Sequence, residues 1–486
     1  MSHFRPSIGI QHSALFVLNT HSIITVKLTM MNQMKSVTVS APGKVLLAGG
    51  YLVLEYPNVG LVIATNKRFY CTIERENSTS TSNSTSTSNN DNDECNIVVK
   101  SPQFHSVWEY RARVDLQDES MYMSLAASQE NTSENAFVEK TLRVTLAYII
   151  SCEKKLPSSL QLTIQADNDF YSVVPHLQGK PRTPESVESL PRFLPCPQDD
   201  HGKVVVHKTG LGSSAALVTS VVGALLQSFS LSLDRAHNLA QICHCHAQGK
   251  VGSGFDVSAA VFGSHVYRRF PTCTLADLLQ DLQSSSSSSL SKNIMTLLQH
   301  TVETTWGGGV VEGMDLPDGL QLLLADVCGG SESPSMARKV LQWKATTRDT
   351  VEQQPYWEEL ARVNPQIIEL LKEADNNKGL QLAFQEARTL LKKMGEAAGV
   401  PIEPAEQTNL ADATSLLEGV LCCVVPGAGG YDAQACLYRG GDVTKAKIGK
   451  LWAEWNQNGT EVCPLAVEAG KAGEGLCVEE TFSPSC

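Results

Sequence analysis

The sequence lacks several features that would each define a class of protein. It contains no run of about eighteen consecutive apolar residues, so we expect no membrane-spanning helix. Lys and Arg are outnumbered by Asp and Glu, 39 to 51, and the resulting net charge of −12 excludes a uniformly basic nucleic-acid-binding protein. No segment repeats at a fixed period, which argues against a solenoid scaffold.

The cysteines are not arranged as a disulfide framework. All fourteen are scattered over 486 positions without regular spacing, whereas disulfide-stabilised folds are short and rich in cysteine. We therefore expect reduced thiols in an intracellular protein. The tightest group is Cys243–His246, where consecutive helical positions would point the side chains in different directions, so we expect no zinc site there.

Length and low-complexity tracts indicate how the chain is organised. At about 150 residues per domain, the sequence corresponds to about three units or to two domains with long insertions. Residues 1–35 have no clear basic leader and no small-residue cleavage site, so we expect a disordered extension. Insertions around residues 270–315 suggest a boundary there, with a first domain at 36–315 and a second at 316–480.

Two tracts have almost no residues that can be buried. Residues 77–90 consist only of Ser, Thr and Asn, and residues 284–289 are six serines, so we expect both to be disordered loops. Proline and charged residues crowd positions 178–200, where we expect a further surface insertion.

Between these tracts, the hydrophobic pattern predicts strands interspersed with helices, which is typical of the α+β or α/β class. The predicted strands are 36–40, 61–74, 160–165, 320–326 and 419–425. The predicted helices are 134–150, 213–229, 380–394 and 442–455. The helix at 213–229 is apolar or small at nearly every position, as expected for a buried helix.

The segment Lys208–Ala216, with the sequence KTGLGSSAA, combines the features of a phosphate-binding loop. Its glycines let backbone N–H groups approach an anion, and the helix start adds unpaired donors and a positive dipole end. Its serines offer hydroxyls to phosphate or to Mg²⁺. The P-loop motif and the H-R-D and D-F-G motifs of protein kinases are absent. A glycine turn capped by serine is the alternative interpretation of this segment alone.

Three more glycine-rich segments contain isolated charges. Ser40–Tyr51 places Lys44 beside a Pro-Gly turn, at the head of an apolar run. Gln248–Asp256 ends in an aspartate after Gly-Ser-Gly, and a helix N-cap would explain Asp256 equally well. Val425–Asp432 follows a predicted strand. Each segment is weak alone, but together they place four glycine-rich turns, Lys and Asp in one chain.

This combination resembles the GHMP small-molecule kinase family, named for galactose, homoserine, mevalonate and phosphomevalonate kinases. Ala41–Lys44 looks like the family's first motif, Gly210–Ala216 matches its second, and Gly427–Gly430 matches its third. The order and separations agree over residues 36–470. Flanking segments such as Ala48–Leu54 are most similar to the eukaryotic members whose acceptor is (R)-5-phosphomevalonate.

The resemblance implies an α+β fold of two domains with the active site between them. The N-terminal half would be similar to ribosomal protein S5 domain 2, and the C-terminal half would be ferredoxin-like. The implied reaction is phosphorylation of (R)-5-phosphomevalonate to the 5-diphosphate with ATP and Mg²⁺, a step of the mevalonate route to isoprenoids. The implied partner is this small molecule, with neither nucleic acid nor membrane, in a monomer or homodimer. We expect a cytoplasmic location, with the peroxisome as the alternative.

The resemblance also implies roles for particular residues. Lys44 and Asp256 would be catalytic, and Ser213 or Ser214 would help to hold Mg²⁺. The implied nucleotide-binding residues are Lys208, Thr209, Gly210, Leu211, Gly212, Ser213, Ser214 and Ala215. The implied substrate-binding residues are Tyr51, Lys250, Ser253, Ser331, Ser333, Gly427, Ala428, Gly429 and Gly430.

The acceptor determines what Asp256 must do. A phosphate monoester has a second pKa of about 6, so it is mostly dianionic at neutral pH and needs no strong base. The difficulty is instead to bring two polyanions together, which requires cations and in-line positioning. We therefore expect Lys208 and Lys250 to join Lys44 in serving the acceptor. The alternative is that Lys208 and Lys250 are solvated loop charges.

Two other functions fit part of the pattern. Mevalonate kinases and diphosphomevalonate decarboxylases share the motifs, and only the details around Gly49–Gly50 and Lys208–Thr209 speak against them. A ligand sensor could keep the fold and bind ATP without turnover. The presence of both Lys44 and Asp256 argues against that function.

Overall fold

The computed structural model describes most of the chain. Its described residues are 36–76, 94–117, 120–129, 133–285, 289–327, 333–347, 356–373, 376–431, 433–457 and 461–480. The predicted extension at 1–35 and the Ser/Thr/Asn tract at 77–90 lie outside these ranges. Ser284 ends a helix and Ser289 begins a strand, so the loop predicted for the six serines is wrong at both of its ends.

The described residues form two sheets and the helices that pack on them. The strands of the first sheet are β1 Ser36–Ala48, β2 Val59–Glu76, β3 Glu94–Ser101, β4 Ser106–Gln117, β5 Ser120–Ala127, β6 Ser159–Ala166, β7 His265–Arg268, β8 Ser289–Ser291, β9 Gly309–Gly313 and β14 Cys477–Val478. The strands of the second sheet are β10 Gln321–Val327, β11 Val420–Val424, β12 Ala433–Tyr438 and β13 Val462–Leu465.

The helices follow the same division in the chain. The helices between β5 and β9 are α2 Ala136–Ser151, α3 Pro184–Glu188, α4 Ser213–Ser228, α5 Ala236–Gln248, α6 Phe255–Phe262, α7 Cys273–Ser284 and α8 Lys292–Glu303. The later helices are α9 Ser333–Thr346, α10 Tyr356–Lys372, α11 Asn377–Ala398, α12 Ala405–Ser415 and α13 Gly441–Gln457. The predicted helices and strands are confirmed within a few residues, except that the strand predicted at 36–40 continues to Ala48, and the α+β class is confirmed.

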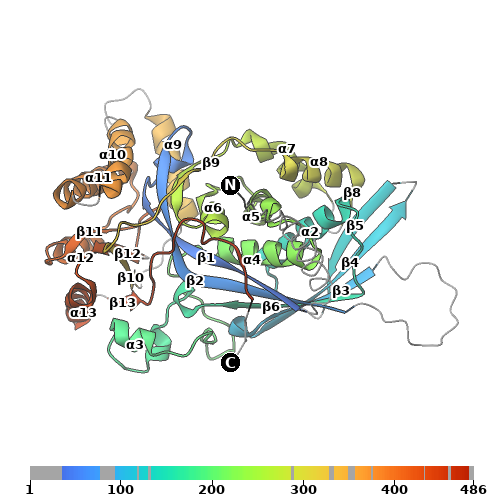
Figure 1. The fold of residues 1–486 in the computed structure, drawn as a ribbon, viewed down its shortest axis with the longest axis horizontal. Coiled ribbons are helices and arrows are strands. Elements are labelled where there is room, and N and C mark those ends of the chain that lie inside the picture. The colour runs from blue at the N-terminus through green and yellow to red at the C-terminus, as the bar shows by residue number, and fades with distance from the viewer. Residues whose placement is uncertain are drawn as a thin grey trace, which may run out of the picture.

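The first sheet is mixed and strongly extended. Its main path runs β14-β1-β2-β6-β3-β4-β5-β8, with β7 beside β2 and β9 beside β7. Strands β3 and β6 are parallel, and the other pairs are antiparallel. Figure 1 shows α2, α4, α5 and α6 grouped over the middle of this sheet. Strand β1 is buried along nearly its whole length because it has neighbours on both edges and α4 on its face.

Helix α4 is the buried helix that the sequence predicts. It contacts β1 and β2 and lies between α2, α5 and α6. Small residues allow this close approach: a Cβ on Gly223 would lie 2.9 Å from Cγ1 of Val39 in β1. The sheet therefore supports the whole of α4 and fixes the position of its N-terminus.

The second sheet has the order β11-β12-β10-β13, and α10, α11, α12 and α13 pack around it (Figure 1). Strand β10 has an antiparallel neighbour on each side, which confirms the prediction of a central strand. The stripe predicted on α11 is also confirmed, since residues such as Leu380, Phe384 and Met394 are buried.

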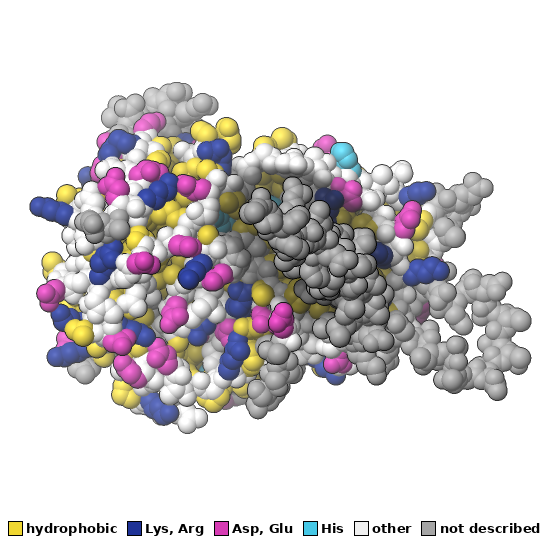
Figure 2. Space-filling view, viewed as in Figure 1, with side chains coloured by type: hydrophobic (Ala, Val, Ile, Leu, Met, Phe, Trp, Pro, Cys, Tyr) yellow, Lys and Arg dark blue, Asp and Glu magenta, His cyan; other side chains and the backbone are white. Residues whose placement is uncertain are grey.

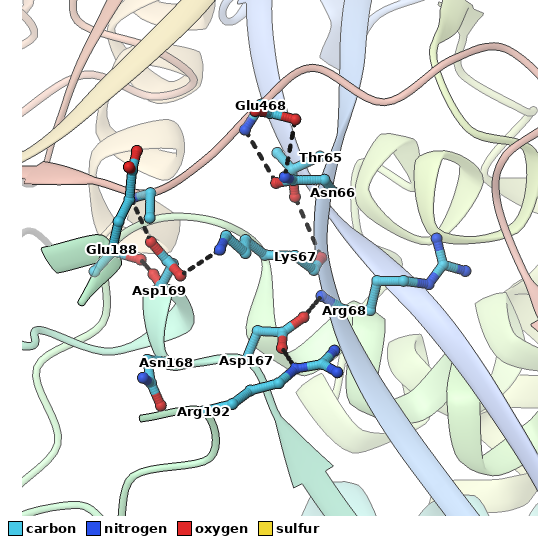
Figure 3. A network of polar contacts seen from close by, with 12 residues as sticks. Thr65, Asn66, Lys67, Arg68, Asp167, Asn168, Asp169, Glu188, Arg192 and Glu468 are labelled. Atoms are coloured by element: carbon cyan, nitrogen blue, oxygen red, sulfur yellow. Dashed lines mark hydrogen bonds and ion pairs between the residues drawn. The ribbon is translucent and has the colours of Figure 1, made fainter. Parts of the chain in front are cut away.

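The chain returns to the first sheet after β13. Residue Gly470 donates its N–H to the carbonyl of Ala64, and β14 pairs with β1. Asn66 and Glu468 bond to each other through both backbone and side chain (Figure 3). We call residues 466–478 the C-terminal strap. It ties the last strand of the second sheet to β2, while the boundary at residues 315–316 stays a prediction.

Residues 178–200 are mostly exposed, as expected for an insertion, yet the segment is anchored. Val187 of α3 packs with Val173, Leu177 and the buried Cys463 of β13. The segment therefore bridges the two sheets instead of lying only at the surface.

Surface and cysteine features agree with the composition. No helix in the described ranges is both long and apolar enough to cross a membrane. In Figure 2, acidic and basic side chains are interspersed over the visible face of the lobe that holds α10–α13. The twelve cysteines within the described ranges have free thiols, which confirms the expectation of reduced cysteines there.

Candidate active site

The segment Gly210–Ser214 forms a tight loop that leads into α4. Gly210 and Gly212 have φ angles of +80° and +77°, a backbone region that side chains with a Cβ rarely adopt. Gly212 is the N-cap of α4, and no acidic residue lies in the first turn. The first N–H groups of a helix have no intrahelical acceptor, and they lie at the positive end of the helix dipole. The loop therefore has the geometry of an anion site.

Lys44 reaches this loop from β1. The Pro-Gly turn that the sequence predicts is wrong, because these residues lie inside β1, at a bulge between Pro42 and Lys44. Lys44 donates its backbone N–H to Leu211 O and its Nζ to Gly210 O, both at 2.9 Å. A Cβ on Gly212 would lie 2.9 Å from Cε of Lys44, so the lysine stem packs directly on the loop.

Asp256 lies in the first turn of α6. The N-cap of α6 is Gly254, so the N-cap interpretation of Asp256 is wrong. Asp256 Oδ1 accepts the N–H of Val257 at 3.0 Å, and the side chain is 19% exposed. Phe255, one residue earlier, lies under Lys44, with its ring centroid 5.5 Å from Nζ. The start of α6 therefore faces the lysine and the loop.

His244 lies in the site, although none of the sequence motifs predicts it. Nε2 of His244 lies 3.1 Å from Oγ of Ser214, 3.3 Å from Nε2 of Gln248 and 3.8 Å from Oδ2 of Asp256. Burial lowers the pKa of His244, Asp256 opposes this shift, and the charge of Lys208 adds to it. The available signal was the i, i+4 spacing of His244 and Gln248, which places both on one face of α5.

The two serines of the loop face different partners. Ser213 is buried near Tyr171, whose pKa is raised by burial. Ser214 is half-buried and faces His244 and, beyond it, Asp256. A hydroxyl and a carboxylate are oxygen ligands of the kind that Mg²⁺ binds while it keeps several waters. The residues present therefore fit Mg²⁺, with Ser214 better placed than Ser213.

The Gly249–Gly254 loop before α6 is held by two residues that the sequence analysis missed. Arg269 donates to the carbonyls of Gly252, at 2.7 Å, and of Leu54, at 2.6 Å. Tyr267 donates its hydroxyl to the carbonyl of Ser253 at 2.8 Å. Lys250, in the same loop, is exposed. These bonds connect the loop before Asp256 to the segment that follows the first motif.

The third motif docks on the end of the first. Tyr51 donates its hydroxyl to the carbonyl of Ala428 at 2.6 Å, and burial raises the pKa of this phenol. Gly427 donates its N–H to Leu46 O at 3.1 Å. A Cβ on Gly50 would lie 2.8 Å from Gly427 O, so the two glycine segments are in direct contact. The structure thus joins motifs that are far apart in the sequence.

The segment before the anion loop, Lys208–Thr209, is held by bonds to residues 169 and 171. Thr209 is buried and donates its hydroxyl to the carbonyl of Asp169. Lys208 is exposed and pairs through its backbone with Tyr171. Ser331 lies outside the described residues, and Ser333 is the first residue of α9. The structure therefore places Lys208 beside the loop, whereas the contribution of the two serines stays a prediction.

Asp169 connects the anion loop to the second sheet. Its Oδ1 accepts the N–H of Ala466 at 2.6 Å, and its Oδ2 lies 3.3 Å from Nζ of Lys67 (Figure 3). Burial raises the pKa of Asp169, and Lys67 and the Ala466 N–H oppose that shift. Since Asp169 O also accepts from Thr209, one residue bonds to β2, the anion loop and the C-terminal strap.

The fold and the site together define a small-molecule kinase of the GHMP type. Three features converge on one side of the first sheet. They are an anion loop at a helix N-terminus, a lysine from the adjacent strand and an aspartate in the first turn of a second helix. Residues 202–264 match the family of GHMP kinases N terminal domain.

Curated relatives give the particular family. Phosphomevalonate kinase ERG8 of Gibberella zeae is 36% identical over 455 residues, which cover 90% of this chain and 96% of that protein. The peroxisomal phosphomevalonate kinase of Arabidopsis thaliana is 33% identical over 516 residues, covering 91% and 96%. The chain belongs to the phosphomevalonate kinase family, and the resemblance to GHMP kinases is confirmed.

Solved structures share the fold. The phosphomevalonate kinase of Streptococcus pneumoniae, in complex with phosphomevalonate and AMPPNP, has a TM-score of 0.56 at 17% identity and covers 89% of this chain and 99% of its own. The mevalonate kinase of Methanococcus jannaschii has a TM-score of 0.51 at 13% identity, covering 90% and 100%. These matches confirm the expected two-domain fold.

Proposed function

We propose that this chain transfers the γ-phosphoryl group of ATP to the phosphate of (R)-5-phosphomevalonate. The products are ADP and (R)-5-diphosphomevalonate. The observation that carries this proposal is the convergence of Lys44, the Gly210–Ser214 loop and Asp256 at the N-termini of two helices. The names of the relatives supply the acceptor, and their lengths match this chain almost completely.

The anion loop binds the nucleotide phosphates in this proposal. Backbone N–H groups of Gly210–Ser214 and the dipole of α4 provide fixed positive potential without any reorganisation during the reaction. Mg²⁺, when bound, would supply positive charge that offsets the negative charge of the phosphates. Ser214 and Asp256 would hold it. A cavity beside the loop, lined by residues such as Tyr171, His176, Pro195 and His207, would take the adenine ring.

The transfer itself requires positioning more than proton removal. An oxygen of the acceptor phosphate attacks the γ-phosphorus, and the bond to the β,γ-bridging oxygen breaks. ADP leaves with the electron pair. The dianionic acceptor has no proton to lose, so Asp256 acts by positioning. Lys44, held by two bonds to the loop, reduces the repulsion between the two phosphates.

The acceptor would lie between the first and third motifs. Tyr51, Lys250 and Ser253 come from the first domain, and the Gly427–Gly430 turn comes from the second. Ser331 and Ser333 complete this proposed set. The support is the hydrogen bond from the Tyr51 hydroxyl to the carbonyl of Ala428, which joins the segment after β1 to the third motif.

ADP release by the purified chain with Mg-ATP tests the function. We expect turnover with phosphomevalonate and none with mevalonate or diphosphomevalonate. Turnover on mevalonate would move the chain to another branch of the family and would make Asp256 a necessary base. Binding of ATP without turnover on any acceptor would support the sensor alternative.

The role of the lysines is tested separately. Lys208→Met and Lys250→Met should each lower kcat/KM for phosphomevalonate while the KM for ATP changes little. Lys447→Met is the matched control, because Lys447 is a surface lysine that pairs with the exposed Glu418 and belongs to none of the motifs. Unchanged kcat/KM in both loop variants would mean that these lysines are solvated charges.

We place the chain in the cytoplasm, and the peroxisomal relative from Arabidopsis thaliana supports the alternative. Imaging of the tagged full-length chain distinguishes the two. Light scattering of the purified chain distinguishes a monomer from a homodimer.

A further inference from the structure

The imidazole of His244 has no role in the reaction as described above. Its side chain is only 3% exposed, and it lies within the core between α4, α5 and α6. Nevertheless its Nε2 lies 3.1 Å from Ser214 Oγ and 3.8 Å from Asp256 Oδ2. These are the two oxygen-bearing side chains that fit Mg²⁺. A single buried nitrogen therefore lies within 4 Å of both.

Hydrogen-bond chemistry defines what this nitrogen does. Gln248 directs its amide nitrogen at Nε2 over 3.3 Å, and an amide NH₂ group can only donate. Nε2 therefore accepts, which leaves the ring proton on Nδ1. The hydroxyl of Ser214 can then donate only its own proton to Nε2. Its two lone pairs are then left free to face a ligand instead of the histidine.

We propose that His244 is a positioning residue that fixes the rotation of the Ser214 hydroxyl and its separation from Asp256. This inference rests on the proposed binding of Mg²⁺ by Ser214 and Asp256. It assigns to His244 no contact with the nucleotide or the acceptor. The effect is to present a preformed pair of oxygens, so that less order has to be gained when the metal-nucleotide binds.

Another buried Ser–His pair shows what a structural pair looks like. His265 Nε2 lies 2.9 Å from Ser258 Oγ, and His265 Nδ1 lies 2.8 Å from the carbonyl of Gly263. Both ring nitrogens of His265 are satisfied inside the core, and Ser258 is fully buried. His244 differs because Ser214, its partner, is half-buried and begins the anion loop. The His265 pair is therefore a matched control.

Binding of AMPPNP, measured by calorimetry with and without Mg²⁺, tests this inference without using activity. His244→Leu should weaken binding of Mg-AMPPNP by about 10- to 100-fold, the usual cost of removing the group that orients a metal ligand. Binding of AMPPNP alone should stay within about twofold of the wild type. His244→Gln should restore much of the affinity, because its amide oxygen can accept the serine proton.

The controls separate positioning from loss of structure. His265→Leu breaks a buried Ser–His pair of similar geometry and should leave the Mg²⁺-dependent affinity unchanged. Ser214→Ala should lose the same Mg²⁺-dependent affinity as His244→Leu, and combining the two should add little, because they act through one oxygen. If His244→Leu does not fold, His244→Gln and Ser214→Ala still test the coupling.

Three results would overturn the inference. These are equal losses with and without Mg²⁺ in His244→Leu, the same loss in His265→Leu, and additive losses when His244→Leu is combined with Ser214→Ala. The proposed function is judged by turnover of the wild-type chain on phosphomevalonate. Wild-type turnover with an unaltered His244→Leu would reject only the role of His244, whereas no wild-type turnover would reject the function itself.

Discussion

Two carboxylates flank the same anion loop, and their surroundings are opposite. Asp169 accepts from Ala466 N–H and pairs with Lys67, and its side chain is only 5% exposed. Asp256 accepts only a helix N–H through Oδ1, while its Oδ2 lies 3.8 Å from His244 and the side chain stays partly open. A carboxylate whose oxygens are used by the fold supports structure. One with a free, accessible oxygen has capacity left for a ligand.

The difference extends to the neighbours of each group. Around Asp169, the partners come from β2 and the C-terminal strap, and together they join the two sheets (Figure 3). Around Asp256, the partners are the N–H of Val257 in α6 and His244 of α5, which also bonds Ser214 of α4. Perturbing Asp169 should therefore change stability, and perturbing the Asp256 side should change the reaction.

The largest effect should come from Lys44, which is proposed to act in the reaction. Lys44→Met should lower kcat by about 10³-fold, because a preorganised charge at the transferring phosphate is lost. The methionine stem can still pack on Gly212, so the unfolding midpoint should stay the same. ADP release at saturating substrates measures the change, with Lys447→Met as the control. A loss below about tenfold would remove Lys44 from the catalytic group.

On the structural side, Asp169→Ala should lower the free energy of unfolding by about 3 kcal/mol, because it leaves Lys67 and the Ala466 N–H without their partner. Asp169→Asn should cost less, since its amide oxygen still accepts from Ala466. Urea unfolding followed by tryptophan fluorescence measures both.

The control for Asp169 is an ion pair at the surface. Glu418 pairs with Lys447 but is 92% exposed, so Glu418→Ala should cause no measurable change. The comparison would break if Asp169→Ala left stability intact and instead altered turnover of the folded enzyme.

The pH dependence of unfolding tests His246, which lies on a different face of α5 from His244. His246, two residues after His244, is buried, and neither of its ring nitrogens has a hydrogen-bond partner among the described residues. Burial lowers its pKa from 6.5 to about 4, and Lys140 and Arg143 add to the shift. The contribution of neutral His246 to the free energy of unfolding is complete above pH 6.5. It is lost as the pH falls from 6.5 to about 4, and the loss amounts to at most about 3 kcal/mol.

His246→Gln should remove this part of the pH dependence. Urea titrations at several pH values between 4 and 7 measure it, with the wild type as the reference. If the free energy of unfolding of His246→Gln depends on pH as steeply as that of the wild type, other groups control acid unfolding.

A smaller effect is expected at Asp256. Asp256→Asn should lower kcat by about 10- to 100-fold, because the acceptor already carries its negative charge and loses only a positioning group. The midpoint of thermal unfolding should not change. A loss near about 10⁴-fold would show true base catalysis and would make Asp256 more than a partner for metal and substrate.

The smallest effect should appear where the two domains meet. Tyr51→Phe loses one hydrogen bond to Ala428 O, worth about 1 kcal/mol, and should raise the KM for phosphomevalonate by about fivefold. Steady-state kinetics with each substrate varied in turn measure the change. A rise in the KM for ATP instead would place Tyr51 on the nucleotide side.

Much of the site could be read from the sequence because its chemistry depends on contiguous residues. The Gly210–Ser214 loop needs glycines for positive φ angles and a helix start directly after it, and both are local properties. Lys44 was found for the same reason, although the turn expected around it is a strand bulge. Strand and helix periods also predicted α4, β10 and α11, since burial imposes those periods on the sequence.

The sequence by itself therefore determined the family, the anion loop and the charged residues beside it, because these follow from backbone conformation over a few residues. Only the tertiary structure decided which side chains meet. It placed His244 against Ser214 and Asp256, gave Asp169 to the strap, and docked Ala428 on Tyr51. Such contacts join segments up to several hundred residues apart, and no local period or turn preference records them.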